Sequence, residues 1–182
     1  IAVNRAVFPL QPKLERILRD LHPQIAAKDI TAILVPCGAW VESDPTLLER
    51  ILRNLIANAV RYTLAGRILV GCRPARMLRI QVWDTGPGIA DIHHDKIFQE
   101  FFQVVNSGRD RSQGMGLGLA IVRRLTQLLG HPLALYSAPG KGAMFEVRVP
   151  EARTAPQKAD APAAAAEAEA VSGLVLVVDD DT

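Results

Sequence analysis

This chain of 182 residues has few aromatic residues, no long apolar run and no large excess of charge of one sign. No apolar stretch approaches the length of about 20 residues that a membrane-spanning helix needs, and no signal peptide opens the chain. The formal net charge of +2 provides no strong electrostatic footprint for nucleic acid. We therefore expect no contact of this fragment with a membrane or with nucleic acid, and an ordinary α/β domain with one core.

Cysteine is as scarce: the two cysteines, Cys37 and Cys72, lie far apart in sequence without the spacing of metal ligands. We interpret them as core or surface thiols of a reducing cytoplasm. The chain begins abruptly inside structured-looking sequence, so we interpret it as a cytoplasmic fragment. A membrane anchor elsewhere in the full-length protein is compatible with this expectation.

Composition divides the chain into three parts. Residues 1–150 alternate helical and strand-like apolar patterns, which predicts a single α/β domain. Residues 151–172 are rich in Ala and Pro and lack apolar periodicity, which is typical of a linker. Residues 173–182 contain one apolar run, residues 174–178, that is typical of a buried strand and is followed by three aspartates.

Apolar spacing and helix-terminal residues predict the elements of the domain. Helices are expected at residues 11–27, about 45–62 and about 116–129. Strands are expected at residues 4–10, 29–36, 39–42, 67–73, 77–83, 133–137 and 143–149. Ser43 or Asp44 is suited to cap the second helix, because Pro45 follows at the first helical position.

The second predicted helix has a broad apolar face but carries Asn54, Asn58 and Arg61 on one stripe. Asparagine is unfavourable inside helices because its side chain competes for backbone hydrogen bonds. The stripe is interpreted either as a solvated face or as part of a metal and phosphate site. Mg²⁺ prefers oxygen ligands and keeps water and substrate phosphates in its shell, so the amide oxygen of Asn58 is a suitable ligand.

In residues 78–84 the apolar residues alternate, and Asp84 continues their inward phase. An inward carboxylate is costly unless it receives hydrogen bonds. Asp84 is therefore either a turn aspartate before Gly86 or an acceptor for the exocyclic amino group of adenine. In the second case Gly86 and Gly88 allow the backbone to approach the base.

Three of the five phenylalanines, Phe98, Phe101 and Phe102, lie within five residues. They are typical of a minor core cluster, and they also suit the anchor of a lid formed by residues 104–113.

A glycine-rich segment, residues 114–118, then opens the last helix. A helix N-terminus binds anions through its free N–H groups, although a glycine-rich entry without a ligand is the plainer interpretation. No Gly-Lys-Ser/Thr follows, which excludes a P-loop, and no strand immediately precedes the segment, which leaves a dinucleotide-binding fingerprint unsupported.

Four segments of the chain are thus residues 54–63, 84–88, 98–102 and 114–118. In this order and spacing they resemble the N, G1, F and G2 boxes of sensor histidine kinases, over roughly residues 44–150. The resemblance implies a two-layer α/β sandwich of the Bergerat type, with a mixed sheet covered on one side by three helices, that binds ATP and Mg²⁺. It assigns magnesium binding to Asn58, with Asn54 as its partner, and phosphate binding to Arg61. It assigns packing against adenine to Tyr62 and recognition of adenine to Asp84. The residues that it assigns to the nucleotide-binding loops are Gly86, Gly88, Gly114, Gly116, Leu117 and Gly118.

Asn54 separates two reaction classes within this resemblance. Relatives that hydrolyse ATP, such as gyrase and the large heat-shock chaperones, carry Glu four residues before the magnesium asparagine, where it activates water as a general base. An amide cannot accept that proton. The resemblance therefore implies phosphoryl transfer to another residue, with Asn54, Asn58 and Arg61 contributing by positioning and neutralisation of charge.

No phosphoacceptor segment accompanies the four boxes. His22 precedes a proline and lacks the acidic neighbour of family acceptors, so we interpret it as structural; His93, His94 and His131 are expected in loops. The resemblance therefore implies a separate dimerisation and phosphoacceptor domain of the same protein as partner. Ala143 stands where the family often has Ser or Thr, so one hydroxyl near the base is missing.

Residues 173–182 resemble the first strand of a response-regulator receiver domain, in which Asp179 and Asp180 correspond to paired magnesium-binding acids. This implies a hybrid kinase with a downstream receiver. Two other functions stay open: a non-catalytic nucleotide-binding or interaction module, and a self-contained ATPase, against which Asn54 argues. A serine-directed kinase of the anti-sigma type is disfavoured by the receiver-like tail.

Overall fold

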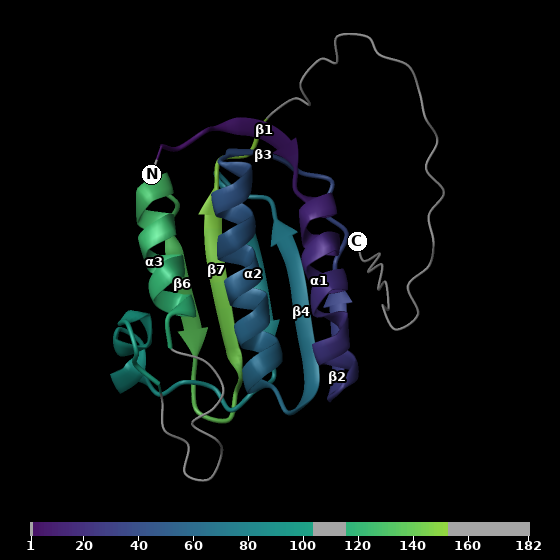
Figure 1. Cartoon of the computed structure of the whole chain (residues 1–182), viewed down its shortest axis with the longest axis vertical. Coiled ribbons are helices and arrows are strands. Elements are labelled where there is room, and N and C mark those ends of the chain that lie inside the picture. Colours follow the sequence, from purple (N-terminus) through teal and green to yellow (C-terminus); the bar gives the residue numbers. More distant parts are fainter. Residues whose placement is uncertain (1, 104–115, 153–182) are drawn as a thin grey trace.

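The computed structural model describes residues 2–103 and 116–152, which form two layers (Figure 1). The elements are β1 (Ala6–Pro9), α1 (Gln11–Ala26), β2 (Asp29–Leu34), β3 (Trp40–Ser43), α2 (Pro45–Tyr62), β4 (Ala65–Arg73), β5 (Leu78–Asp84), two 3₁₀ turns (Asp91–His93 and Lys96–Phe98), α3 (Gly118–Leu129), β6 (Leu133–Ser137) and β7 (Ala143–Val149). No helix within these residues has the length and apolar character needed to cross a membrane.

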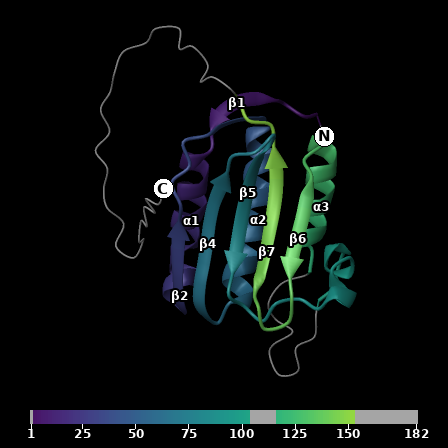
Figure 2. The ribbon, with the colours of Figure 1, turned by 180° about the vertical axis from the view of Figure 1, so that it is seen from behind.

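A five-stranded sheet in the order β2-β4-β5-β7-β6 forms one layer, and α1, α2 and α3 cover one of its faces. β2 runs parallel to β4, while the other neighbours are antiparallel. The predicted two-layer architecture with a mixed sheet and three helices is confirmed. Figure 2 shows that the other face of the sheet carries no helix.

β1 and β3 form a separate antiparallel pair at one end of the sheet. The chain leaves the domain beside this pair, because Val41 bridges Glu151 and the N–H of Ala152 donates to the carbonyl of Trp40 at 2.8 Å. The entry and exit of the domain are therefore close together. Apart from residues 151 and 152, the predicted linker and receiver strand lie outside the described residues and stay predictions.

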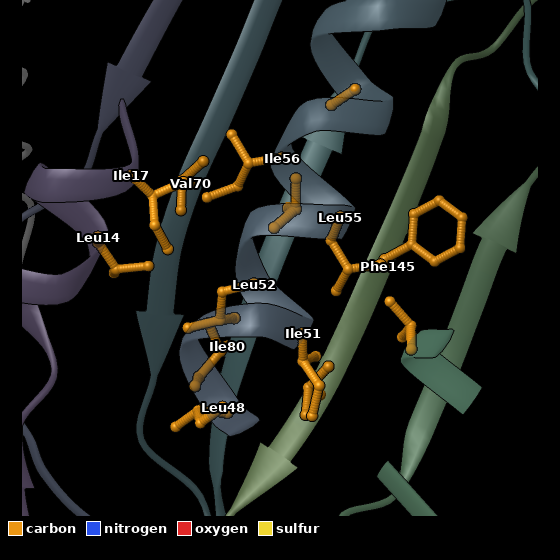
Figure 3. Packing of buried hydrophobic residues seen from close by; sticks show 14 of the residues in the cluster. Leu14, Ile17, Leu48, Ile51, Leu52, Leu55, Ile56, Val70, Ile80 and Phe145 are labelled. Carbon is orange, nitrogen blue, oxygen red and sulfur yellow. The ribbon is translucent and has the colours of Figure 1, made fainter. Parts of the chain in front are cut away.

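The core lies between the helices and the sheet (Figure 3). α2 buries one face completely, at Leu48, Ile51, Leu52 and Ile56 among others. Each such side chain contributes about 1.5–3 kcal/mol when it is fully buried. This apolar face packs α2 against the sheet. The polar stripe of α2 is thereby directed away from the core.

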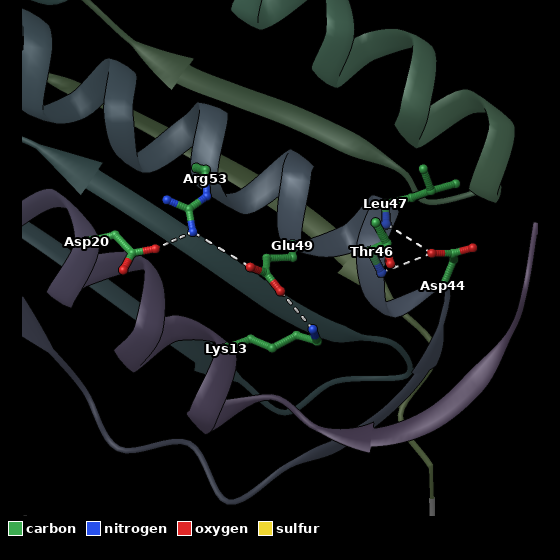
Figure 4. A network of polar contacts seen from close by, with 7 residues as sticks. All are labelled: Lys13, Asp20, Asp44, Thr46, Leu47, Glu49 and Arg53. Atoms are coloured by element: carbon green, nitrogen blue, oxygen red, sulfur yellow. Dashed lines mark hydrogen bonds and ion pairs between the residues drawn. The ribbon is translucent and has the colours of Figure 1, made fainter.

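Asp44, one of the two residues predicted as caps, is the N-cap of α2. Its side chain accepts from the N–H groups of Thr46 at 3.0 Å and Leu47 at 2.9 Å (Figure 4). It also accepts from the N–H of Asn4 at 2.8 Å. Backbone donors, that of Leu47 first, hold the pKa of Asp44 below its usual value. α3 begins at Gly118, two residues later than expected, and ends at Gly130, whose φ of 69° lies in the left-handed region that suits glycine.

Ion pairs connect α1 with α2 on the outer surface (Figure 4). Lys13 contacts Glu49 at 2.9 Å, and Arg53 contacts Asp20 at 2.6 Å and Glu49 at 3.6 Å. Lys13 and Glu49 are partly exposed and Arg53 and Asp20 are exposed, so water screens these pairs and each contributes little. They therefore add little to the apolar packing that holds the two helices together.

The expectation of two thiols was wrong: Cys37 and Cys72 form a disulfide. Cys37 lies in the loop after β2, and Cys72 lies on β4, which pairs with β2. This pairing brings the two Cα atoms to 6.0 Å, within the usual range for a disulfide, despite a sequence separation of 35 residues. The cysteines therefore give no support to a reducing compartment.

Candidate functional site

An open pocket lies at the end of the sheet where α2 and β5 end, opposite the β1–β3 pair, and it encloses about 720 Å³ of space continuous with solvent. Polar residues on its wall include Asn58, Tyr62 and Asp84. The other lining residues are Ala59, Pro87, Gly88, Ile89, Ile97, Phe102, Gln103, Leu119, Ala143 and Phe145. A largely apolar pocket with a few polar groups is typical of a small-molecule site.

Asp84 ends β5 with its side chain on the helix-covered side of the sheet, as its phase predicted. Its Oδ1 accepts from the N–H of Gly86 at 2.9 Å. Burial raises the pKa of this carboxyl, and the N–H groups of Gly86 and Ala143 counteract the rise. The pocket therefore presents a half-buried acceptor whose orientation is set by its own turn.

The asparagine stripe of α2 lies against the start of α3. A Cβ atom placed on Gly118 would lie 3.1 Å from Oδ1 of Asn54 and 3.7 Å from the amide of Asn58. Nδ2 of Asn54 donates to the carbonyl of Arg50 at 2.8 Å, whereas Asn58 lines the pocket. The first and fourth segments of the sequence thus meet through a glycine that leaves room for both amides.

Arg61 is exposed on the last turn of α2 and does not contribute to the pocket wall. Its predicted contact with phosphate stays a prediction. Tyr62, half exposed, lies on the wall where adenine packing is expected.

The loop after β5 is clamped to the turn between β6 and β7. The N–H of Ile89 donates to Oγ of Ser137 at 2.8 Å, and this hydroxyl donates to the carbonyl of Gly142 at 2.7 Å. Gly88 has a φ of 71°, and a Cβ atom there would collide with the carbonyl of Ala138. Gly88 is therefore required for the close approach of two backbone segments, and Ser137 holds them together.

The third and fourth segments also meet. The N–H of Phe101 donates to the carbonyl of Gly116 at 3.2 Å, and Gly116 has a φ of 67°. Leu117 precedes α3 directly, but Leu119 is the leucine that lines the pocket. Gly114 and the predicted lid, residues 104–113, lie outside the described residues.

The three phenylalanines do not form one cluster. Phe102 lines the pocket, and Phe98 packs edge-on against Phe145 with 6.4 Å between the ring centroids. Phe101 is 69% exposed and has a φ of 64°, which is uncommon for an aromatic residue. The predicted core cluster is therefore confirmed for Phe98 and Phe102 only.

Two residues at this end were missed by sequence reasoning. Thr63 is fully buried and its hydroxyl has no partner, and a Cβ atom on Gly86 would lie 3.5 Å from that oxygen. Nζ of Lys28 donates to the carbonyls of Val60 at 2.6 Å, Arg61 at 2.8 Å and Thr63 at 3.1 Å. Nothing in the local pattern of either residue signals these contacts, because each depends on a distant segment.

The contacts of Lys28 fasten the last turn of α2. Carbonyls at a helix C-terminus lack intrahelical donors and carry the negative end of the helix dipole, so an ammonium group there is stabilising. Burial, with the nearby Arg61 charge, lowers the pKa of Lys28. The turn that carries Tyr62 is thus held by a residue outside the pocket wall.

The donor set suits a magnesium-bound adenine nucleotide. An apolar wall matches a base, and Asp84 is an acceptor beside it. The unpartnered Thr63 hydroxyl is not on the wall but lies near Gly86, next to Asp84. Groups of three or more His, Cys, Asp or Glu that would hold a metal alone do not occur in residues 2–103 and 116–152. Magnesium held here would depend on the amide of Asn58 together with phosphate oxygens and water.

None of the histidines in the described part of the chain lines this pocket. His22 is exposed on α1, and His94 contacts the carbonyl of Ile89 at 3.0 Å. His131 is buried and contacts Oγ of Ser43 at 2.7 Å. The prediction that the site lacks its own phosphoacceptor is consistent with these positions.

Residues 43–153 match the family model described as histidine kinase-, DNA gyrase B- and HSP90-like ATPase. The sensor histidine kinase AtsR of Burkholderia thailandensis is 36% identical over 172 residues, which cover 88% of this chain and 28% of that protein. The virulence sensor protein BvgS of Bordetella bronchiseptica is 40% identical over 149 residues, which cover 75% of this chain and 12% of that protein. The chain thus spans about a quarter or less of the length of these relatives.

Solved structures agree with this match. Full-length ShkA in complex with AMPPNP superposes with a TM-score of 0.73 and 31% identity, covering 85% of this chain and 33% of that chain. The catalytic domain of histidine kinase ThkA superposes with a TM-score of 0.69 and 25% identity, covering 81% of this chain and 98% of that chain. The chain belongs to the family of histidine kinase-, DNA gyrase B- and HSP90-like ATPases, and within it to the ATP-binding catalytic domains of sensor histidine kinases.

Proposed function

We propose that this domain binds Mg-ATP and transfers the γ-phosphoryl group to a histidine on a separate dimerisation domain of the same protein. Asn54 is the observation that carries the proposal, because hydrolases of the family need a carboxylate at this position to activate water. The amide of Asn54 is instead bonded to the carbonyl of Arg50. The carboxylate that lines the pocket, Asp84, lies at the end of β5 and is held by its own turn.

Each pocket residue has a defined task in this proposal. Asp84 accepts from the exocyclic amino group of adenine, and Tyr62 packs against the base. Asn58 holds the magnesium ion, which neutralises phosphate charge when bound, and Arg61 contacts the phosphates. The loop glycines bring backbone N–H groups close to the nucleotide. Catalysis then consists of positioning and electrostatic stabilisation.

Titration calorimetry with a non-hydrolysable ATP analogue tests the adenine assignment. Hydrogen bonds to charged groups contribute about 1.5–3 kcal/mol, so Asp84→Asn should weaken binding about 10- to 100-fold. Asp91→Asn, on an exposed residue outside the pocket, is the matched control. Unchanged affinity in Asp84→Asn would refute the adenine role.

Phosphotransfer is tested by mixing the domain with radiolabelled ATP and an acceptor domain of the same protein. We expect label on the acceptor histidine, and loss of magnesium-dependent transfer in Asn58→Ala. Binding without transfer would favour a non-catalytic nucleotide-binding module. Phosphate release well above background, with no acceptor present, would favour a self-contained ATPase.

We also propose that the full-length protein is a cytoplasmic hybrid kinase with a receiver downstream. The support is the resemblance of residues 173–182 to a receiver strand. The Cys37–Cys72 disulfide conflicts with a reducing compartment, where such bonds are rare. Acid quenching of intact cells, followed by alkylation of the denatured protein, decides the matter. Modification of both cysteines supports the cytoplasmic location, and modification of neither cysteine contradicts it.

A further inference from the structure

β6 is an edge strand: β7 lies on one side of it, and no strand of the described chain lies on the other (Figure 2). The carbonyl of Pro132, directly before β6, accepts from the N–H of Arg148 on β7 at 2.9 Å. In an antiparallel pair, residues bonded in this way alternate with residues whose N–H and C=O point away from the partner strand. The backbone groups of Leu133 and Leu135 therefore point outward, and we find no hydrogen bond to them within the part of the chain that the structure describes.

The sequence of β6 does not protect this edge. Natural edge strands are usually protected from pairing with another chain by a lysine or other charge, a proline or a bulge. β6 reads Leu-Ala-Leu-Tyr-Ser, which contains no charge and no proline, and its register with β7 is regular. The opposite edge strand, β2, begins instead with the charged Asp29. β6 is thus the edge at which the sequence does not hinder pairing with a further strand.

A groove that encloses about 690 Å³ of space continuous with solvent lies between β6, α3 and the second 3₁₀ turn. Leu133 and Leu135 line it from β6, and Phe98 lines it from the turn. No described residue lines both this groove and the nucleotide pocket. Because the side chains of a strand alternate between the two faces of a sheet, a strand added beside β6 places every second side chain in this groove.

The charges of the groove favour an acidic occupant. Arg123 of α3 lies on its wall, with the guanidinium 5.8 Å from the centroid of the Phe98 ring, and no ion pair joins Arg123 to another described residue. Arg5 adds a second positive charge at the C-terminal end of α3, where it donates to the carbonyl of Leu129 at 3.0 Å. Asp95 is the one acidic residue among the described residues of the wall. A carboxylate on the occupant complements this excess of positive charge.

We propose that the groove between β6 and α3 binds an extended, acidic segment of a partner protein, which joins the sheet as a sixth strand beside β6. The backbone of the segment pairs with the outward groups of Leu133 and Leu135, its apolar side chains fill the groove, and a carboxylate contacts Arg123. In this mode of recognition, backbone hydrogen bonds provide affinity and the groove selects the side chains. The interaction requires neither nucleotide binding nor phosphotransfer, so its failure leaves the proposed function unaffected.

Backbone pairing is tested with a fluorescent synthetic peptide of alternating valine and threonine that ends in aspartate, titrated with the protein and followed by fluorescence anisotropy. Two further peptides carry N-methyl groups, one on its valine amides and the other on its threonine amides. Because the N–H groups of a strand alternate in direction, one methylated peptide loses the donors that face β6 and should bind at least about 10-fold more weakly. The other should bind as the parent peptide does. Equal affinities of the two methylated peptides would overturn the proposal.

The charge of the groove is tested with Arg123→Glu, which should weaken binding of the parent peptide about 10-fold. A peptide that ends in lysine should restore binding to this variant. Arg124→Glu makes the same change at the next position of α3, outside the groove wall, and should behave as the unaltered protein.

Two other outcomes would also overturn the proposal. One is the absence of saturable binding to the unaltered protein at peptide concentrations up to about 1 mM. The other is self-association of the domain that competes with the peptide, because a second copy of the chain would then occupy the edge.

Discussion

The two ends of the sheet are built on different principles. At the β1–β3 end, side chains such as Leu10, Leu14 and Val41 are fully buried, and a disulfide joins two segments. At the pocket end, Tyr62 and Phe101 are exposed, and Asp84 and Asn58 are only partly buried. One end is closed and supplies stability, whereas the other is open and holds polar groups that a ligand can satisfy.

Because of this difference, the stability of the domain and its binding of nucleotide depend on opposite ends of the same helices. α2 begins at the closed end with a capped and buried N-terminus and ends at the pocket, where Lys28 holds its last turn. Changes at the closed end should therefore lower the free energy of unfolding, and changes at the open end should lower nucleotide affinity.

The largest effect is expected at the closed end. Leu14→Ala should lower the free energy of unfolding by about 2–5 kcal/mol, because it leaves a cavity in a site that is fully buried. Urea denaturation measures the loss. Calorimetry on the folded fraction should give unchanged nucleotide affinity. A parallel fall in affinity would contradict the expectation that the closed end affects stability alone.

His131, also at the closed end, should make stability dependent on pH. Burial lowers its pKa from 6.5 to about 4, and the nearby Arg5 charge adds to the shift. Because the folded protein holds the neutral form, stability is fully present above pH 6.5 and falls as the pH drops toward 4, by at most about 3 kcal/mol. The difference in urea midpoint between the parent and His131→Gln, measured across this interval, isolates the effect.

His22→Gln serves as the control for that experiment, since His22 is exposed on α1. It should leave the pH profile unchanged. A parent profile that coincides with that of His131→Gln between pH 6.5 and 4 would contradict the assignment.

A smaller effect is expected at the open end from Lys28→Met. The last turn of α2 loses the donor to three carbonyls, and charge–dipole contacts of this kind contribute about 0.3–2 kcal/mol. Nucleotide affinity should fall by at most about 30-fold in titration calorimetry, which is the upper end of that range. Lys13→Met removes a lysine from the other end of α1 and should leave affinity unchanged, while equal losses in both variants would refute the positioning role.

The smallest effect is expected at the surface between α1 and α2. Asp20→Asn removes an exposed ion pair with Arg53 and should leave the free energy of unfolding and the nucleotide affinity almost unchanged, because water screens the pair. Thermal melts at low and high salt measure it. A larger loss would show that the helical layer depends on charge more than on apolar packing.

Much of the fold follows from local patterns. The bounds of α2 were predicted correctly and its cap was narrowed to Ser43 or Asp44, because capping residues, Pro45 and a regular apolar spacing act within a few residues. The start of α3 was placed two residues early, since its glycines permit several conformations. The inward position of Asp84 followed from the period of a strand, which is also a local property.

Residues that depend on distant contacts were not predictable in this way. Cys37 and Cys72 meet because β2 pairs with β4, and Lys28 reaches α2 from the end of α1. Ser137 connects two loops that are far apart in the chain, and Thr63 is left without a partner beside Gly86. Neither composition nor periodicity carries information about such pairs.

The sequence by itself determined the element types, the four segments and the amide of Asn54 in place of a carboxylate, because these are properties of residues and of their near neighbours. The tertiary structure alone decided that Asn58, Tyr62, Asp84 and Gly88 share one pocket wall. It also decided that Trp83 lies between Leu69 and Met144, and Arg79 between Arg73 and Arg148, on the helix-free face of the sheet. Both arrangements arise from strand register and helix packing, which join residues that the chain keeps apart.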